Sequence, residues 1–287
     1  MRISLKWPVL ALCVCLPLTA AQAHRMWMMP SATVLSGEDL WVTVDAAVSN
    51  DLFYFEHFPL RIANLGTPSP DMPTGRGGRG AELLITAPDG SKVEPKNGSL
   101  GRYRTTFDVP LAQKGTYKLA VLNSGVFASY KEGGQTKRWG GTIEDFEKNV
   151  NPKADDLRAS YNQSRLEVFV TSGKPTADTL KVTGKGLELA PVTHPNDLIA
   201  ETPATFQMLL DGKPAANLEV EVVPGGNRYR DKLGDMKLTT DKDGKFTVTW
   251  PAPGMYWMEA VATDDKGPNA TINRRRASYV ATLEVLP

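Results

Sequence analysis

Short runs of β-prone residues, separated by turn residues, recur along the whole chain. Several of them alternate apolar and polar side chains at a period of two, which is typical of strands with one buried face. The clearest runs cover residues 40–44, 82–86, 103–107, 116–122, 166–171, 204–210, 218–223, 245–250, 255–261 and 279–285. Turns such as Pro88-Asp89-Gly90 and Asp241-Lys242-Asp243-Gly244 separate them. Because Asp and Gly favour the backbone conformations of tight turns, the pattern predicts an all-β protein.

Two segments interrupt this pattern. The stretch Ile143–Arg158 mixes charged residues with apolar ones and contains Pro152, which predicts a short helix followed by a loop. Segment 66–80 is rich in Gly and Pro and predicts a long loop. With a boundary near Gly184-Lys185-Gly186, we expect two tandem antiparallel immunoglobulin-like β-sandwich domains, over residues 24–183 and 187–287.

The first 23 residues have the features of a secretory signal peptide. Arg2 and Lys6 precede an apolar run from Val9 to Leu18, and small residues flank Gln22. We therefore expect an exported protein that is cleaved after Ala23. The apolar run is shorter than the ~20 residues that cross a bilayer, and no later run reaches that length, so the mature chain is predicted to have no membrane span.

Composition and charge narrow the function. The chain has 33 Lys and Arg against 32 Asp and Glu, a formal net charge of +1, which gives no reason to expect nucleic-acid binding. Both cysteines, Cys13 and Cys15, lie in the predicted signal peptide. Thiolate metal sites and cysteine nucleophiles are therefore not expected. No serine-nucleophile motif or phosphate loop is present, and the triplet Arg274-Arg275-Arg276 is interpreted as a basic turn on a solvated face.

The three histidines carry the most specific chemical information. Cleavage after Ala23 makes His24 the first residue, whose α-amino nitrogen and ring Nδ1 can chelate one metal ion. A second imidazole, from His57 or His194, would complete a three-nitrogen set that suits Cu(II) best and Ni(II) next. Each internal histidine also has a structural interpretation. His57 has Phe55 and Phe58 close to it in the sequence and could be a hydrogen-bonded core residue, and His194 could cap the turn at Pro195.

Several segments together resemble a known family. They are the predicted mature start His24-Arg25-Met26-Trp27, residues 49–57 and 192–197, and the segments 210–215, 240–244 and 277–280. They resemble bacterial secreted proteins grouped as a domain of unknown function and often described as the periplasmic component of an ABC-type cobalt or nickel transport system. The resemblance implies a periplasmic, two-domain β protein that handles a transition-metal ion. It implies metal-ligand roles for His24, His57 and His194.

Three functions are compatible with these observations. The expected one is a non-enzymatic, periplasmic metal-binding protein for nickel, cobalt or copper, acting as a metallochaperone or as an accessory of a membrane metal transporter. A second is a copper-dependent oxidative enzyme, with Phe53, Tyr54 or Phe58 beside the metal. A third is a metal-free structural or interaction module of the envelope, for which exposed strand edges would bind partners. His57 and His194 lie on opposite sides of the predicted boundary, so a site containing both would lie between the domains.

Overall fold

The computed structural model describes residues 24–67 and 80–287. The predicted signal peptide and most of the predicted loop 66–80 lie outside the described residues. Across the described ranges the protein consists of strands, one helix, α1 (Ile143–Asn149), and two 3-10 turns at Asp178–Leu180 and Asn227–Tyr229. The prediction of an all-β fold is confirmed. As for membrane spans, the described part contains no helix that is long and apolar enough to cross a bilayer.

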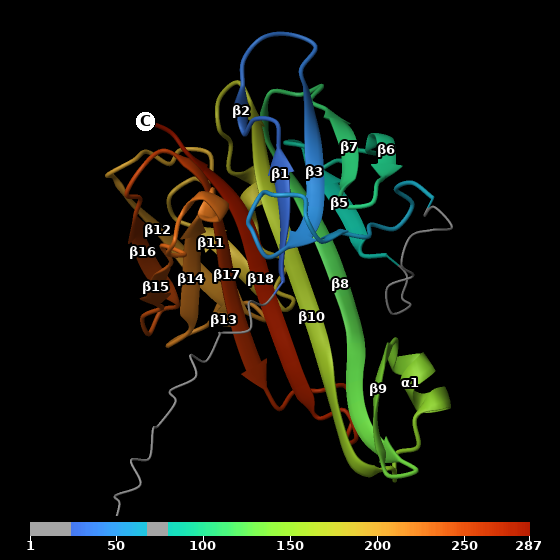
Figure 1. The fold of residues 1–287 in the computed structure, drawn as a ribbon. Helices are drawn as coiled ribbons and strands as arrows, with labels where there is room; N and C mark the ends of the chain where they lie inside the picture. Colours follow the sequence, from blue (N-terminus) through green and yellow to red (C-terminus); the bar gives the residue numbers. More distant parts are fainter. Residues whose placement is uncertain (1–23, 68–79) are drawn as a thin grey trace, which may run out of the picture.

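Three sheets form the fold (Figure 1). The first sheet has the strand order β1-β3-β7-β6, with β4 beside β3; the strands are β1 (Arg25–Pro30), β3 (Trp41–Ser49), β4 (Phe58–Pro59), β6 (Lys96–Leu100) and β7 (Thr105–Pro110). The third sheet has the order β11-β12-β13, with β16 beside β12; the strands are β11 (Leu187–Pro191), β12 (Pro203–Leu210), β13 (Lys213–Pro214) and β16 (Lys245–Thr249).

The second sheet is the largest and has the order β15-β14-β17-β18-β10-β8-β5, with β2 beside β10 and β9 beside β8. Its strands are β2 (Val34–Leu35), β5 (Glu82–Thr86), β8 (Gly115–Glu132), β9 (Gln135–Gly141), β10 (Asp155–Ser172), β14 (Glu219–Pro224), β15 (Met236–Thr239), β17 (Gly254–Asp264) and β18 (Arg274–Val285). Strand β10 belongs to the predicted N-terminal domain (residues 24–183) and β18 comes from the end of the chain. They pair in parallel from Ser160 with Arg274 to Val168 with Thr282, so both halves contribute to one continuous sheet.

The two other sheets cover opposite faces of this large sheet. On the face that we call the front, the first sheet contributes Trp27 and Phe107 to a core shared with Leu166. On the back, the third sheet packs Phe206 against Tyr279. Because side chains alternate along a strand, neighbouring residues of β18 enter different cores. The strand is therefore buried continuously from Ala277 to Leu283 instead of at alternate residues.

Strands β8 and β10 are each 18 residues long, and with β9 they continue beyond the first sheet (Figure 1). The back of this extension is covered by a small core that includes Val126, Phe146 and Ile272. Helix α1 supplies Phe146 and is capped at its N-terminus by Thr142, whose hydroxyl accepts a hydrogen bond from the Asp145 N–H. The stretch 143–158 therefore divides: it is helical to Asn149 and belongs to β10 from Asp155 onwards.

The arginine triplet is not a solvated turn, as the sequence suggested, because it begins strand β18. Arg275 points to the back and is buried, whereas Arg274 and Arg276 are exposed on the front. The Arg275 guanidinium donates to Asp211 at 3.1 and 2.8 Å and to Asp264 at 3.0 and 2.5 Å. These hydrogen bonds lower the pKa of both carboxyl groups. They also fasten the turn after β12 to the end of β17.

Replacing Arg275 tests this ion cluster. Arg275→Ala removes the shared donor and leaves two partly buried carboxylates unpaired, so we expect the free energy of unfolding to fall by about 3 kcal/mol. The matched control Arg274→Ala removes an exposed guanidinium from the adjacent position and is expected to change stability by less than about 0.5 kcal/mol. Urea unfolding followed by tryptophan fluorescence measures both values. Equal losses of stability in the two variants would contradict a stabilising role of the Arg275 ion cluster.

Candidate metal centre

His24 and His57 lie side by side. Their ring centroids are 4.0 Å apart and the rings are nearly parallel, at 21°. The topology explains this meeting, because the residues that follow them begin β1 and β4, which pair with the end of β3. Arg25 pairs with Ser49, and Phe58 pairs with Val48. Both imidazoles are exposed, and the Phe58 ring lies 4.4 Å from that of His57.

Two tryptophans fix the strand that carries His24. The Trp27 indole N–H donates to the Ser49 hydroxyl at 2.8 Å, and its buried ring contacts Phe53 and Phe55. From β17, the Trp257 indole N–H donates to the Met26 carbonyl at 2.9 Å. Strand β1 is therefore held both within its own sheet and against the large sheet.

The loop that leads to His57 is held by buried and half-buried polar groups. One carboxylate oxygen of Glu56 accepts the Asn50 N–H at 2.6 Å and the Asp51 N–H at 3.4 Å. Asn227, from the second half of the chain, accepts the Leu52 N–H at 2.8 Å. The sequence analysis did not identify Glu56 or Asn227 as supports. Adjacency to His57 could have suggested Glu56, but no local signal points to Asn227.

The charges next to His24 are compensated. The Arg25 guanidinium lies 3.6 Å from a carboxylate oxygen of Glu221 and 5.2 Å from the Trp257 ring centroid. Glu259 lies opposite Glu221 on the neighbouring strand. Burial raises the pKa of Glu259, and the Glu221 carboxylate acts in the same direction, while Arg276 and Arg25 act against them. Arg25, the residue after His24, thus reduces the repulsion between the carboxylates of Glu221 and Glu259.

The donor set of the pair is two imidazoles. Within residues 24–67 and 80–287, no three side chains of His, Cys, Asp or Glu are close enough to hold one metal ion. The nearby carboxylates of Glu56 and Glu221 already accept hydrogen bonds or an ion pair. Among the described residues, the pair therefore has no third His, Cys, Asp or Glu side chain placed to share one ion with it.

His194 lies in a different place and has another role. Its Nδ1 accepts the Asn196 N–H at 3.0 Å, and its Nε2 lies 3.1 Å from both the Thr176 carbonyl and the Thr116 hydroxyl. A backbone N–H only donates and a carbonyl only accepts, so the proton is on Nε2. Both ring nitrogens are thus engaged in joining the turn after β11 to β8 and to the Thr176 backbone. Burial lowers the pKa of this half-buried imidazole.

This pKa shift predicts a dependence of stability on pH. Because the pKa in the folded state is below the ordinary value of 6.5, the unfolded chain binds a proton first as the pH falls. The stabilisation by neutral His194 is complete above the unfolded pKa and decreases below it. We expect the free energy of unfolding of His194→Asn to be lower than that of the wild type by about 1 kcal/mol at neutral pH. This difference in stability should be smaller at about pH 5. Urea unfolding at both pH values measures it, and a gap independent of pH would contradict it.

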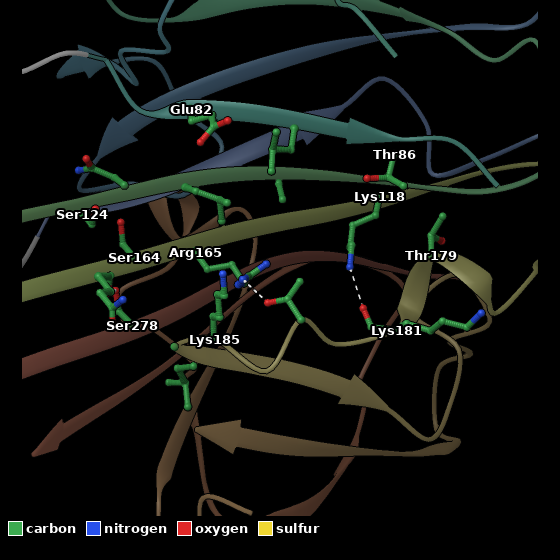
Figure 2. A pocket seen from close by; sticks show the side chains of 18 of the residues that line it. Glu82, Thr86, Lys118, Ser124, Ser164, Arg165, Thr179, Lys181, Lys185 and Ser278 are labelled. Atoms are coloured by element: carbon green, nitrogen blue, oxygen red, sulfur yellow. Dashed lines mark hydrogen bonds between the residues drawn. The ribbon is translucent and has the colours of Figure 1, made fainter. Parts of the chain in front are cut away.

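A separate cleft of about 710 Å³ lies between strands β5, β8 and β10 and the segment 178–187 (Figure 2). Most cations of this cleft already have partners. Lys118 donates to the Lys181 carbonyl at 3.2 Å, and Arg165 lies within 3.4 Å of Glu167 and Glu188. These contacts join the two halves of the chain. The three histidines are not among the lining residues.

The comparisons with known proteins identify the family. No curated protein matches the chain. The D0-D1 domain of intimin covers 91% of this chain and 97% of its own length at 12% identity, with a TM-score of 0.22. A trypsin-activated α2-macroglobulin from Escherichia coli covers 91% at 13% identity with a TM-score of 0.21, and this chain spans 16% of its length. At such scores they indicate nothing about function. A family model, "Domain of unknown function (DUF4198)", matches residues 21–264, and the chain therefore belongs to this family.

Proposed function

We propose that this chain is a periplasmic metal-binding protein whose site is formed by His24 and His57. It would act as a metallochaperone or as an accessory of a membrane metal transporter. The observation that carries the proposal is the pairing of these two exposed imidazoles, with ring centroids 4.0 Å apart, at the end of β3. Exposed rings can rotate about their side-chain torsions and direct one nitrogen each at a single ion.

The third ligand is the α-amino group of His24. Cleavage after Ala23 would create it, and together with Nδ1 of the same residue it forms a six-membered chelate. His57 then supplies the third nitrogen. This set agrees with the absence of a three-side-chain cluster in the described ranges. Such a site depends on correct processing, because one extra residue before His24 converts the amine into an amide.

Ligand chemistry and family resemblance favour different metals. Three nitrogen donors bind Cu(II) more strongly than Ni(II), and Ni(II) more strongly than Co(II), at equal availability. The resemblance to periplasmic components of cobalt or nickel transport systems favours the other two ions. In each case the ion is cargo. The exposure of both histidines supports transfer to a partner, since an exposed ion exchanges ligands readily.

One observation supports a second candidate, a copper-dependent oxidative enzyme. The exposed Phe58 ring lies 5.7 Å from His24 and 4.4 Å from His57, where it could shield one side of a copper ion. This activity would consume dioxygen or peroxide when copper and a reductant are supplied. The metal-transfer protein would not.

The N-terminal chelate can be tested by titration. Processed protein, with its N-terminus verified by mass spectrometry, is titrated with Cu(II), Ni(II) and Co(II) against a competing chelator. We expect tight Cu(II) binding that falls at least about 100-fold on retention of Ala23 or on His57→Ala, since each change removes a ligand. His194→Asn is the matched control and should retain affinity. The proposed ligand set would be contradicted if His194→Asn lost Cu(II) binding while the other two variants kept it.

Glu56 is expected to position His57. Glu56→Ala removes the acceptor of two backbone N–H groups in the loop, so we expect Cu(II) affinity to fall by about 10-fold, as for other supports of ligands. Glu56→Gln keeps an acceptor oxygen and should restore most of the affinity. Copper binding and thermal unfolding are measured together. Loss of affinity in proportion to loss of stability in both variants would indicate a merely structural role.

A further inference from the structure

The extension of the large sheet presents an exposed, cationic front face. On this face, side chains from β8, β9, β10 and β18 point away from the small core that covers the back. We call the set Phe127, Arg138, Arg158, Arg274 and Arg276 the arginine face; all five residues are exposed. Phe127 has 53% of its surface accessible, which is unusual for a phenylalanine.

The strand registers place these residues together. Phe127 pairs with Ser160 and Gly140, and Ser160 pairs with Arg274. Ser129 pairs with Arg138 on one side and with Arg158 on the other. Residues directly opposite in a sheet project from the same face. Neighbouring strands are about 4.8 Å apart, so Arg138 and Arg158 are separated by roughly 10 Å across the sheet.

Most of this positive charge is not neutralised within the described part of the chain. Among the described residues, no carboxylate oxygen lies within 4.0 Å of Arg138, Arg158 or Arg274, although Arg158 interacts electrostatically with Asp156. Arg276 is 3.9 Å from Glu259. At the far tip, Lys131 is paired with Asp156 at 2.6 Å, so that end adds little net charge. Three guanidinium groups without a close ion pair among the described residues thus surround one exposed aromatic ring.

The first sheet does not cover the arginine face. The first sheet covers the front of the large sheet at Leu166 and Val280, but the same face remains open farther along β10 and β18. The extension has its own core on the back, so its strands stay ordered without a cover on the front. Figure 1 shows β8, β9 and β10 continuing past β1 and β3.

We propose that the arginine face docks on an anionic phospholipid membrane surface. Guanidinium groups bind phosphate oxygens in a bidentate manner, and each basic residue near an anionic leaflet adds to the attraction. The exposed Phe127 ring lies among them and would enter the headgroup region, as aromatic side chains do at membrane interfaces. A sheet face with one projecting ring suits a broad lipid surface.

Vesicle sedimentation tests the docking. The processed full-length protein, with a metal chelator present so that metal binding has no influence, is mixed with vesicles of phosphatidylcholine alone or with phosphatidylglycerol added. We expect binding to the anionic vesicles only, weakening as salt is raised. The triple variant Arg138→Gln/Arg158→Gln/Arg274→Gln should bind at least about 10-fold more weakly. Phe127→Ala should show a smaller loss.

A matched control has the same change in net charge elsewhere. Lys185, Lys213 and Lys232 are exposed and have no ion pair within the described residues, so the triple Lys→Gln variant should bind vesicles like the wild type. Equal losses in the two triple variants would overturn the proposal, because they would indicate an effect of net charge alone. It would also be overturned if the wild type bound no vesicles, even if inorganic phosphate or an acidic protein bound to the arginine face.

Discussion

The parallel pairing of β10 with β18 is the constraint on which the rest of the structure depends. It joins residues 160–168 to residues 274–282, so two segments far apart in the sequence meet inside the large sheet. A slip of one residue would exchange the faces of every side chain in β18. Tyr279 would then leave the second core, and Arg275 would leave Asp211 and Asp264 for the exposed front.

The strands could be predicted from the local sequence pattern, whereas their long-range pairing could not. The period-two alternation identified the strands, because half-buried strands repeat it regardless of partners. The union of both halves in one sheet could not be predicted, because nothing in 160–168 specifies 274–282. The arginine triplet illustrates the same limit. A run of like charges is normally solvated, and only the register shows that Arg275 faces two carboxylates while Arg274 and Arg276 face solvent.

The candidate ligands could be predicted from the sequence, but their arrangement in space could not. Residue type and the predicted cleavage point selected His24, and the scarcity of histidine selected His57 and His194. The arrangement of β1 and β4 around β3 brings only the first two together. His194 instead makes a hydrogen bond with the N–H of Asn196, as in the turn-capping interpretation. The supports from Asn227 and Trp257 come from far along the chain, so only the fold relates them to the site.

The histidine pair and the arginine face lie on the same side of the large sheet. Arg25, next to His24, contacts Glu221 and Trp257 on the front, and Arg276 lies near Glu259 there. If His24 and His57 hold a divalent ion and the arginine face docks on a membrane, as proposed, the ion adds positive charge to the side that docks. The two binding events then favour each other by the same factor, because coupling between sites is reciprocal. Glu221 and Glu259 stand between the two sites and offset part of this charge. The coupling is therefore expected to be modest and to decrease with ionic strength, since salt screens interactions between exposed charges.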